Sequence, residues 1–134
     1  MDKPKEWLRF AYIDLLSCKK LLDDELLSNI VAFHTQQTIE KSLKALLVFH
    51  NHKIPKVHSL MKLFDLCNDF NLNENEDIIL KLDNLYIESR YPSSFGLLPY
   101  GKPSKKDTAE FFTFASEVFD ATCKILNINK ESLI

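Results

Sequence analysis

The sequence predicts an all-α protein, an up-and-down antiparallel bundle of about five helices forming one domain over residues 1–134. Glycine occurs only at Gly96 and Gly101, whereas the tight turns of β-hairpins usually need it. Long stretches without Gly or Pro carry apolar residues at helical spacing. The connections between these stretches are short, so we expect consecutive helices to pack as antiparallel neighbours. A chain of 134 residues with 46% hydrophobic residues is long enough to bury a core.

The first predicted helix begins near Pro4, a favourable first-turn residue, and runs to about Asp24. An apolar stripe follows it at helical spacing: Trp7, Ala11, Cys18, Leu21 and Leu22. Asp14 falls inside that stripe. A carboxylate on a packed face must be paired or hydrogen-bonded, so we expect Asp14 to have a partner on the second or fourth helix. The candidate partners are Lys41, Lys44 and Arg90.

The second helix is predicted from an N-cap at Ser28 to about Asn51, before the Ile54-Pro55 pair. One face is apolar: Ala32, Ile39, Leu43, Leu46 and Leu47. An arc of roughly 120° on the opposite side is polar: His34, Gln37, Glu40, Lys41 and Lys44. Glu40 and Lys44 form an i,i+4 pair of favourable orientation. The arc is either a solvated, salt-bridged surface or a polar seam that is paired across helices or lines an anion site.

Three further helices are predicted over about 59–70, 74–91 and 104–126. Asn-rich residues 71–75 form a turn, and Pro92 ends the fourth helix. Residues 93–103 are a loop, and Ser104 with Asp107 resembles a capping box. Tyr86 and Arg90 lie one turn apart at the end of the fourth helix. Arg90 either caps its own helix or binds a phosphate through two parallel hydrogen bonds.

The charge distribution separates two parts of the chain. Residues 41–64 hold five lysines and three histidines but no Asp or Glu, whereas residues 68–134 hold eleven Asp/Glu against seven Lys/Arg. The basic window is compatible with a local anion-binding patch, or with a solvated basic helix end. The histidines at 50, 52 and 58 do not share one helical face and have no nearby carboxylate or cysteine in the sequence. We therefore predict no metal or other cofactor, and interpret His58 as a helix-start residue.

The three cysteines, Cys18, Cys67 and Cys123, are widely spaced and form no C-x-x-C pair. An odd number without a visible secretory signal predicts reduced, buried thiols in the cytoplasm. No apolar run approaches the roughly 20 residues that span a membrane, so no membrane association is expected.

Three segments together resemble the HEPN domain family, in its minimal, nucleotidyltransferase-associated form. Residues 32–45 read AFHTQQTIEKSLKA and resemble the family's most characteristic helix. His58-Ser59-Leu60 resembles the start of its next helix, and residues 86–92, YIESRYP, resemble the end of its fourth. The resemblance implies a helical bundle that forms a homodimer. It also implies a minimal nucleotidyltransferase as partner in a toxin–antitoxin-like pair.

Many HEPN domains are metal-independent ribonucleases that use an Arg with a His shortly after it. This chain has Arg90, but no histidine follows it, because the last one is His58. The resemblance therefore favours a binding module for a nucleotide or RNA phosphate. The residues expected to bind are Arg90, Tyr91, Lys41, Lys44, Gln37, Glu40 and His34, with Asp14, His58 and Tyr86 in structural polar roles. Two alternatives stay open: a ribonuclease in which His34 or His58 replaces the missing histidine, and a purely structural dimer.

Overall fold

The structure, a computed structural model, describes residues 3–50, 53–89 and 102–134, without the side chains of residues 87–89. Within these ranges it contains five α-helices and no strand, so the predicted all-α class is confirmed. The helices are α1 (Lys3–Leu21), α2 (Ser28–Phe49), α3 (Leu60–Leu66), α4 (Glu76–Ser89) and α5 (Lys105–Leu126). The described ranges also contain three short 3₁₀ turns: η1 (Glu25–Leu27), η2 (Asn68–Phe70) and η4 (Lys130–Leu133).

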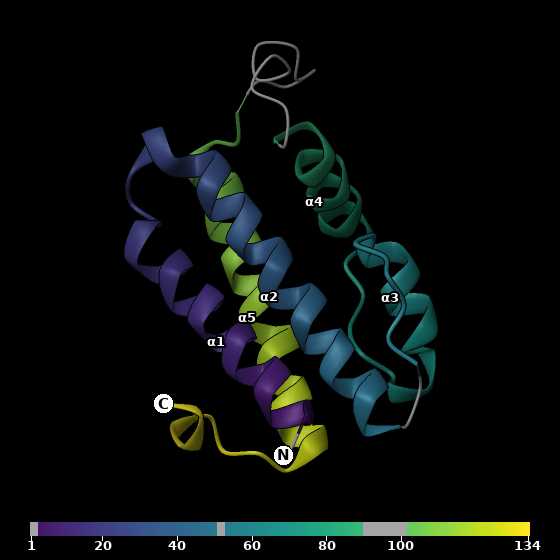
Figure 1. Cartoon of the computed structure of the whole chain (residues 1–134). Coiled ribbons are helices and arrows are strands. Elements are labelled where there is room, and N and C mark those ends of the chain that lie inside the picture. Colours follow the sequence, from purple (N-terminus) through teal and green to yellow (C-terminus); the bar gives the residue numbers. More distant parts are fainter. Residues whose placement is uncertain (1–2, 51–52, 90–101) are drawn as a thin grey trace.

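Helix α2 is the central element of the bundle. Figure 1 shows α1, α2 and α5 side by side as three long helices, with the shorter α3 and α4 following one another along the other side of α2. The apolar face predicted for α2 is buried, with Ile39, Leu43 and Leu46 inaccessible to solvent. Each such side chain contributes roughly 1.5–3 kcal/mol of burial free energy. Because four other helices contact α2, its remaining faces are also partly covered.

The connection from α1 to α2 differs from the prediction. Helix α1 ends at Leu21 rather than near Asp24, and the Asp24 side chain instead caps η1 by accepting a hydrogen bond from the Leu26 N–H. Ser28 is not the N-cap of α2: Leu27 holds that position, and Ser28 is the first helical residue. The reason is that the chain passes from the 3₁₀ turn directly into α2, so the side-chain cap is Asp24, at the start of that turn, rather than a residue at the start of α2.

Helix α3 is short and is held by a carboxylate from another helix. Ser59 is its N-cap and accepts a hydrogen bond from the Lys62 N–H. Asp83 of α4 accepts hydrogen bonds from the Leu60 and Met61 N–H groups, which have no partner within the helix. The predicted third helix over 59–70 is divided, because α3 ends at Leu66 and η2 follows with Asn71 in the left-handed region (φ 55°).

The last helix begins as predicted. Ser104 and Asp107 form a capping box in which each side chain accepts a hydrogen bond from the other residue's backbone N–H. Helix α5 ends at Leu126, and Asn127 takes the left-handed conformation that terminates it. The chain then turns back through η4, which contacts α1 and buries Leu133.

Candidate functional site

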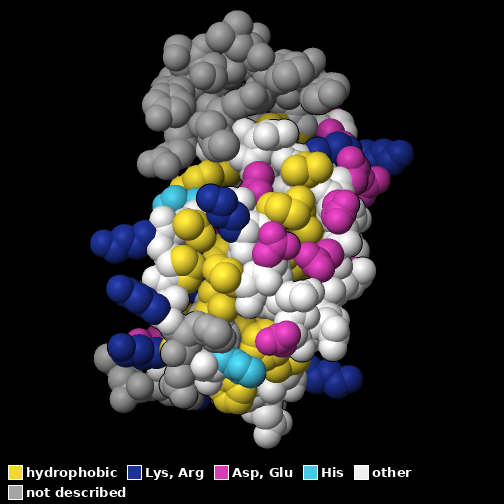
Figure 2. Space-filling view, turned by 90° about the vertical axis from the view of Figure 1, so that its right-hand side faces the viewer, with side chains coloured by type: hydrophobic (Ala, Val, Ile, Leu, Met, Phe, Trp, Pro, Cys, Tyr) yellow, Lys and Arg dark blue, Asp and Glu magenta, His cyan; other side chains and the backbone are white. Residues whose placement is uncertain are grey.

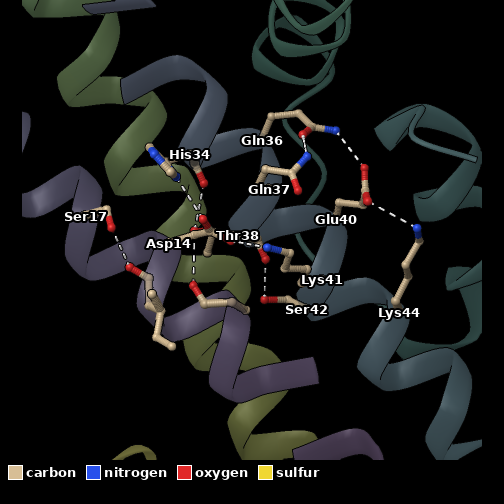
Figure 3. Close-up of polar contacts among 12 residues, drawn as sticks. Asp14, Ser17, His34, Gln36, Gln37, Thr38, Glu40, Lys41, Ser42 and Lys44 are labelled. Atoms are coloured by element: carbon tan, nitrogen blue, oxygen red, sulfur yellow. Dashed lines mark hydrogen bonds and ion pairs between the residues drawn. The ribbon is translucent and has the colours of Figure 1, made fainter. Parts of the chain in front are cut away.

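The polar arc of α2 divides into two clusters, each centred on a carboxylate. The first, called the Asp14 cluster, consists of Asp14 from α1 with His34 and Lys41 from α2. Asp14 Oδ1 lies 2.8 Å from His34 Nδ1, and Oδ2 lies 2.6 Å from Lys41 Nζ. Figure 3 shows Asp14 between these two side chains. The predicted pairing of Asp14 with the second helix is thus confirmed for Lys41.

The geometry of this cluster fixes the chemistry of its imidazole. A carboxylate only accepts hydrogen bonds, so His34 Nδ1 carries the proton that is donated to Asp14. In the neutral ring, Nε2 then bears the lone pair. The Phe33 ring meets the His34 ring edge-on, with centroids 5.4 Å apart, and restrains it from a second side. The His34 ring is therefore held in one orientation and is partly exposed.

The second cluster, called the Glu40 cluster, consists of Glu40 and Lys44 of α2, Gln36 of α2, and His58 from the segment before α3. Glu40 Oε2 lies 3.1 Å from Lys44 Nζ, which confirms the predicted i,i+4 pair. Glu40 Oε1 accepts a hydrogen bond from Gln36 Nε2 and lies 3.1 Å from His58 Nδ1. Gln36 also donates to the His58 carbonyl, so the amide ties α2 to the chain that leads into α3.

The two lysines differ in their access to solvent. The side chain of Lys44 is only 7% exposed, and its ammonium also lies 5.6 Å from the centre of the Trp7 ring. Lys41 is 23% exposed and lies 6.0 Å from the centre of the Phe10 ring. An anion from solvent can therefore approach Lys41 but is separated from Lys44 by the surrounding side chains. Gln37, also predicted to bind, donates to the Gln36 side-chain oxygen.

A row of aromatic rings, called the aromatic row, crosses from α2 to α4 and on to the segment before α3. Phe33 and Tyr86 are stacked, with centroids 6.1 Å apart and planes 13° from parallel. The centre of the His58 ring lies 5.4 Å from that of Tyr86, and the His34 ring meets the Phe33 ring edge-on. Two members are substantially accessible, Phe33 at 37% and the His58 side chain at 52%.

Three lysines of the basic window remain exposed to solvent. Lys53, Lys56 and Lys62 are exposed and form no ion pair within the part of the chain that the structure describes. On the face that Figure 2 shows, several Lys and Arg side chains project along one edge of an apolar band, while Asp and Glu gather toward the opposite side. The lysines that predicted an anion site thus separate into two that are paired with a carboxylate, Lys41 and Lys44, and three that are not.

The thiols are buried and poorly reactive. Burial raises the pKa of Cys18 and of Cys67 from 9.0 to about 12, and that of Cys123 to about 11. The nearby charge of Asp14 adds to the effect at Cys18. Over residues 3–50, 53–89 and 102–134, no group of three or more His, Cys, Asp or Glu side chains is arranged to hold a metal ion. None of the helices in these ranges is long and apolar enough to cross a membrane.

The remaining predicted residues have different outcomes. Arg90 and Tyr91 lie outside the described residues, so their binding roles stay predictions. His58 immediately precedes the N-cap of α3, as interpreted from the sequence, but its ring contacts Glu40 and Tyr86. Gln36, Phe33 and Asp83 have roles in these contacts that the sequence does not predict. Their signal was present as polar or aromatic residues on otherwise packed helices, but their partners come from distant segments.

The arrangement of the helices agrees with comparisons to known proteins. A family model described as "HEPN domain" matches residues 4–126, and the chain belongs to the HEPN family. Membership supports a nucleotide- or RNA-binding module or one of ribonuclease type. The crystal structure of TT1696 from Thermus thermophilus has the same fold, with a TM-score of 0.66 and 23% identity over 92% of this chain and 98% of that one. No significant match was found among curated proteins.

Proposed function

We propose that this HEPN domain is a cytoplasmic binding module that engages the phosphates of RNA or of a nucleotide, and that it acts as a homodimer with a minimal nucleotidyltransferase in a toxin–antitoxin-like pair. One observation carries the phosphate-binding part. Lys53, Lys56 and Lys62 are exposed within twelve residues of one another in the basic window, with no ion pair in the described structure. Unpaired lysines attract phosphates without first having to break an internal ion pair.

The Asp14 cluster contributes a further cation, Lys41, to the proposed binding residues. The Lys41 ammonium has three N–H donors, and one of them is directed at Asp14. The others are available to an incoming phosphate oxygen. Lys44 is given a different role, because its ammonium is enclosed between Glu40 and Trp7. Arg90 and Tyr91 complete the proposed binding residues from the sequence.

The binding test compares two triple variants with the same change in charge. Single-stranded RNA carrying a fluorophore is titrated with protein, and anisotropy is recorded at several salt concentrations. Replacing Lys53, Lys56 and Lys62 by Gln is expected to weaken binding and to flatten the salt dependence, because each lost phosphate contact reduces the slope by about one. The control replaces the exposed Lys105, Lys106 and Lys124 of α5 by Gln. Equal weakening by both triple variants would contradict the proposed surface.

The partner and the oligomeric state are tested separately. HEPN domains often dimerise, so a dimer is expected in sedimentation at micromolar concentration. Co-expression with a nucleotidyltransferase encoded beside this gene is expected to yield a complex. If the two proteins purify separately, the proposed partner is wrong. The phosphate-binding surface is tested independently by the anisotropy measurement.

A second candidate function is supported by the orientation of His34. Its Nε2 lone pair is suited to take the proton of a ribose 2′-OH. The 2′ oxygen would then attack phosphorus, the bond to the 5′ oxygen would break, and that oxygen would take a proton from water. Cleavage of RNA but not of 2′-O-methyl RNA, lost in His34→Ala or Arg90→Ala, is the expected signature. If the RNA stays uncleaved after incubation with the wild-type protein, this function is eliminated.

The third possibility is a purely structural dimer. Arg90 would then cap its own helix, and Arg90→Ala would lower the thermal unfolding midpoint without changing RNA affinity. The same anisotropy and melting measurements, performed on one protein preparation, separate this outcome from the first two.

A further inference from the structure

We infer that the aromatic row is a base-stacking subsite, which makes the preferred ligand single-stranded RNA rather than an isolated phosphate group. This inference rests on the phosphate binding proposed above and adds the part of the ligand that the lysines do not recognise. The observation behind it is that three separate segments bring His34, Phe33, Tyr86 and His58 into continuous ring contact.

Two rings of the row, Phe33 and His58, are accessible where an ordinary packing cluster would be covered. Phe33 lies on the most central helix of the bundle, yet it is 37% exposed. A single exposed apolar side chain needs no explanation, but a group of joined rings in which Phe33 and His58 are both exposed indicates a contact surface. Aromatic faces bind unpaired bases of any sequence, because every base has a π-face.

The ends of the row are held in fixed orientation. His34 is fixed through Nδ1 by Asp14, and His58 lies within hydrogen-bonding distance of Glu40 through its own Nδ1. Both carboxylates are buried, so neither ring is free to rotate without losing a buried contact. Rigid rings lose little conformational entropy when a base stacks on them.

Charge complementarity identifies the occupant. His58 lies in the sequence between Lys56 and Lys62, both exposed, so the row and the basic window meet at its end. Stacking rings beside a cationic path are the combination by which proteins hold single-stranded nucleic acid. Double-stranded RNA does not fit, because its bases are already stacked and paired. A second copy of this chain, the other conceivable occupant, would bring the same positive charge to the same face.

The experiment compares two ligands that differ only in their bases. A short single-stranded RNA and an abasic oligomer of the same length and charge are titrated with wild-type protein, Phe33→Leu and the control Phe49→Leu. Leucine keeps the site apolar but removes the ring, and Phe49 is an exposed phenylalanine at the other end of α2. Circular dichroism confirms that each variant is folded.

The wild type is expected to bind the RNA roughly ten-fold or more tightly than the abasic oligomer, the effect of about one stacked base. Phe33→Leu is expected to abolish that difference, and Phe49→Leu to keep it. Equal affinities of the wild type for the two ligands would overturn the stacking subsite while leaving phosphate binding intact, whereas no binding of either ligand would overturn the proposed function itself. A change of oligomeric state in Phe33→Leu, with the base-dependent difference retained, would assign the row to a protein interface and overturn the inference.

Discussion

The Asp14 cluster and the Glu40 cluster contain the same three kinds of group, a carboxylate, a lysine and a histidine, but the structure uses them differently. In the Glu40 cluster the lysine is enclosed and the histidine is the exposed end, at 52%. In the Asp14 cluster the lysine and the histidine have similar, intermediate exposure. Equal composition therefore does not imply equal roles, because burial decides which group a ligand can reach.

The energetic consequence also differs between the clusters. A buried charge that loses its partner must be desolvated without compensation, and this is strongly destabilising. A partly exposed charge regains water and loses much less. We therefore expect the Glu40 cluster to act mainly in stability and the Asp14 cluster to tolerate change and contact ligand. Three predictions test this difference, and one at alkaline pH tests the burial of the thiols.

The largest effect is expected for Glu40→Ala. Removing this carboxylate leaves the Lys44 ammonium buried without its partner and removes one of the two acceptors of the Gln36 amide. The free energy of unfolding should fall by about 3–5 kcal/mol. Urea unfolding followed by circular dichroism measures it. The matched control is Asp77→Ala, which removes the carboxylate of the i,i+4 pair with Lys81 on the surface of α4 and should leave stability unchanged.

A smaller loss is expected for Asp14→Ala. Lys41 and His34 are partly exposed and can both bind water when the carboxylate is removed. The free energy of unfolding should therefore fall by about 2 kcal/mol, less than in the more buried Glu40 cluster. The same unfolding experiment applies. An Asp14→Ala loss equal to or greater than that of Glu40→Ala would show that the two clusters do not differ as their exposure indicates.

The third prediction concerns alkaline pH. The pKa of Cys18 and of Cys67 is about 12 in the folded protein and 9.0 for an ordinary thiol, so above pH 9 the unfolded chain loses protons that the folded chain retains. Stability is therefore fully present below pH 9 and is lost as the pH rises toward 12. At pH 10 each of these two thiols should cost roughly 1 kcal/mol of stability. A variant with all three cysteines replaced by Ala should show a smaller fall between pH 8 and 10; an identical fall would contradict the assignment.

The smallest effect is a change in which thiol reacts first. The Cys18 thiol donates to the Val31 carbonyl between α1 and α2, while the Cys67 thiol donates to the Leu43 carbonyl between α3 and α2. Asp14→Ala should therefore speed alkylation of Cys18 more than of Cys67, because it loosens the α1–α2 contact. Glu40→Ala should favour Cys67. Mass spectrometry of iodoacetamide-treated protein at pH 8 measures both rates, and parallel changes in the two variants would show that the clusters open together.

Local patterns predicted the helices well where they depended on short-range chemistry. The capping box at Ser104 and Asp107 and the i,i+4 pair of Glu40 and Lys44 were predicted and are present, because their partners lie within one turn. The end of α1 and the N-cap of α2 were wrong, because an intervening 3₁₀ turn uses Asp24 as its cap. Nothing in the local sequence distinguishes a serine that caps a helix from one that follows such a turn.

The sequence by itself determined the all-α class, the apolar face of α2 and the need of Asp14 for a partner, since these follow from helical periodicity and from the cost of burying a charge. Only the tertiary structure decided which lysines are enclosed and which face solvent. It also decided that Asp83 caps α3 and that Phe33 stacks on Tyr86. These contacts join residues more than twenty positions apart, and their formation depends on how whole helices pack rather than on the spacing of any one of them.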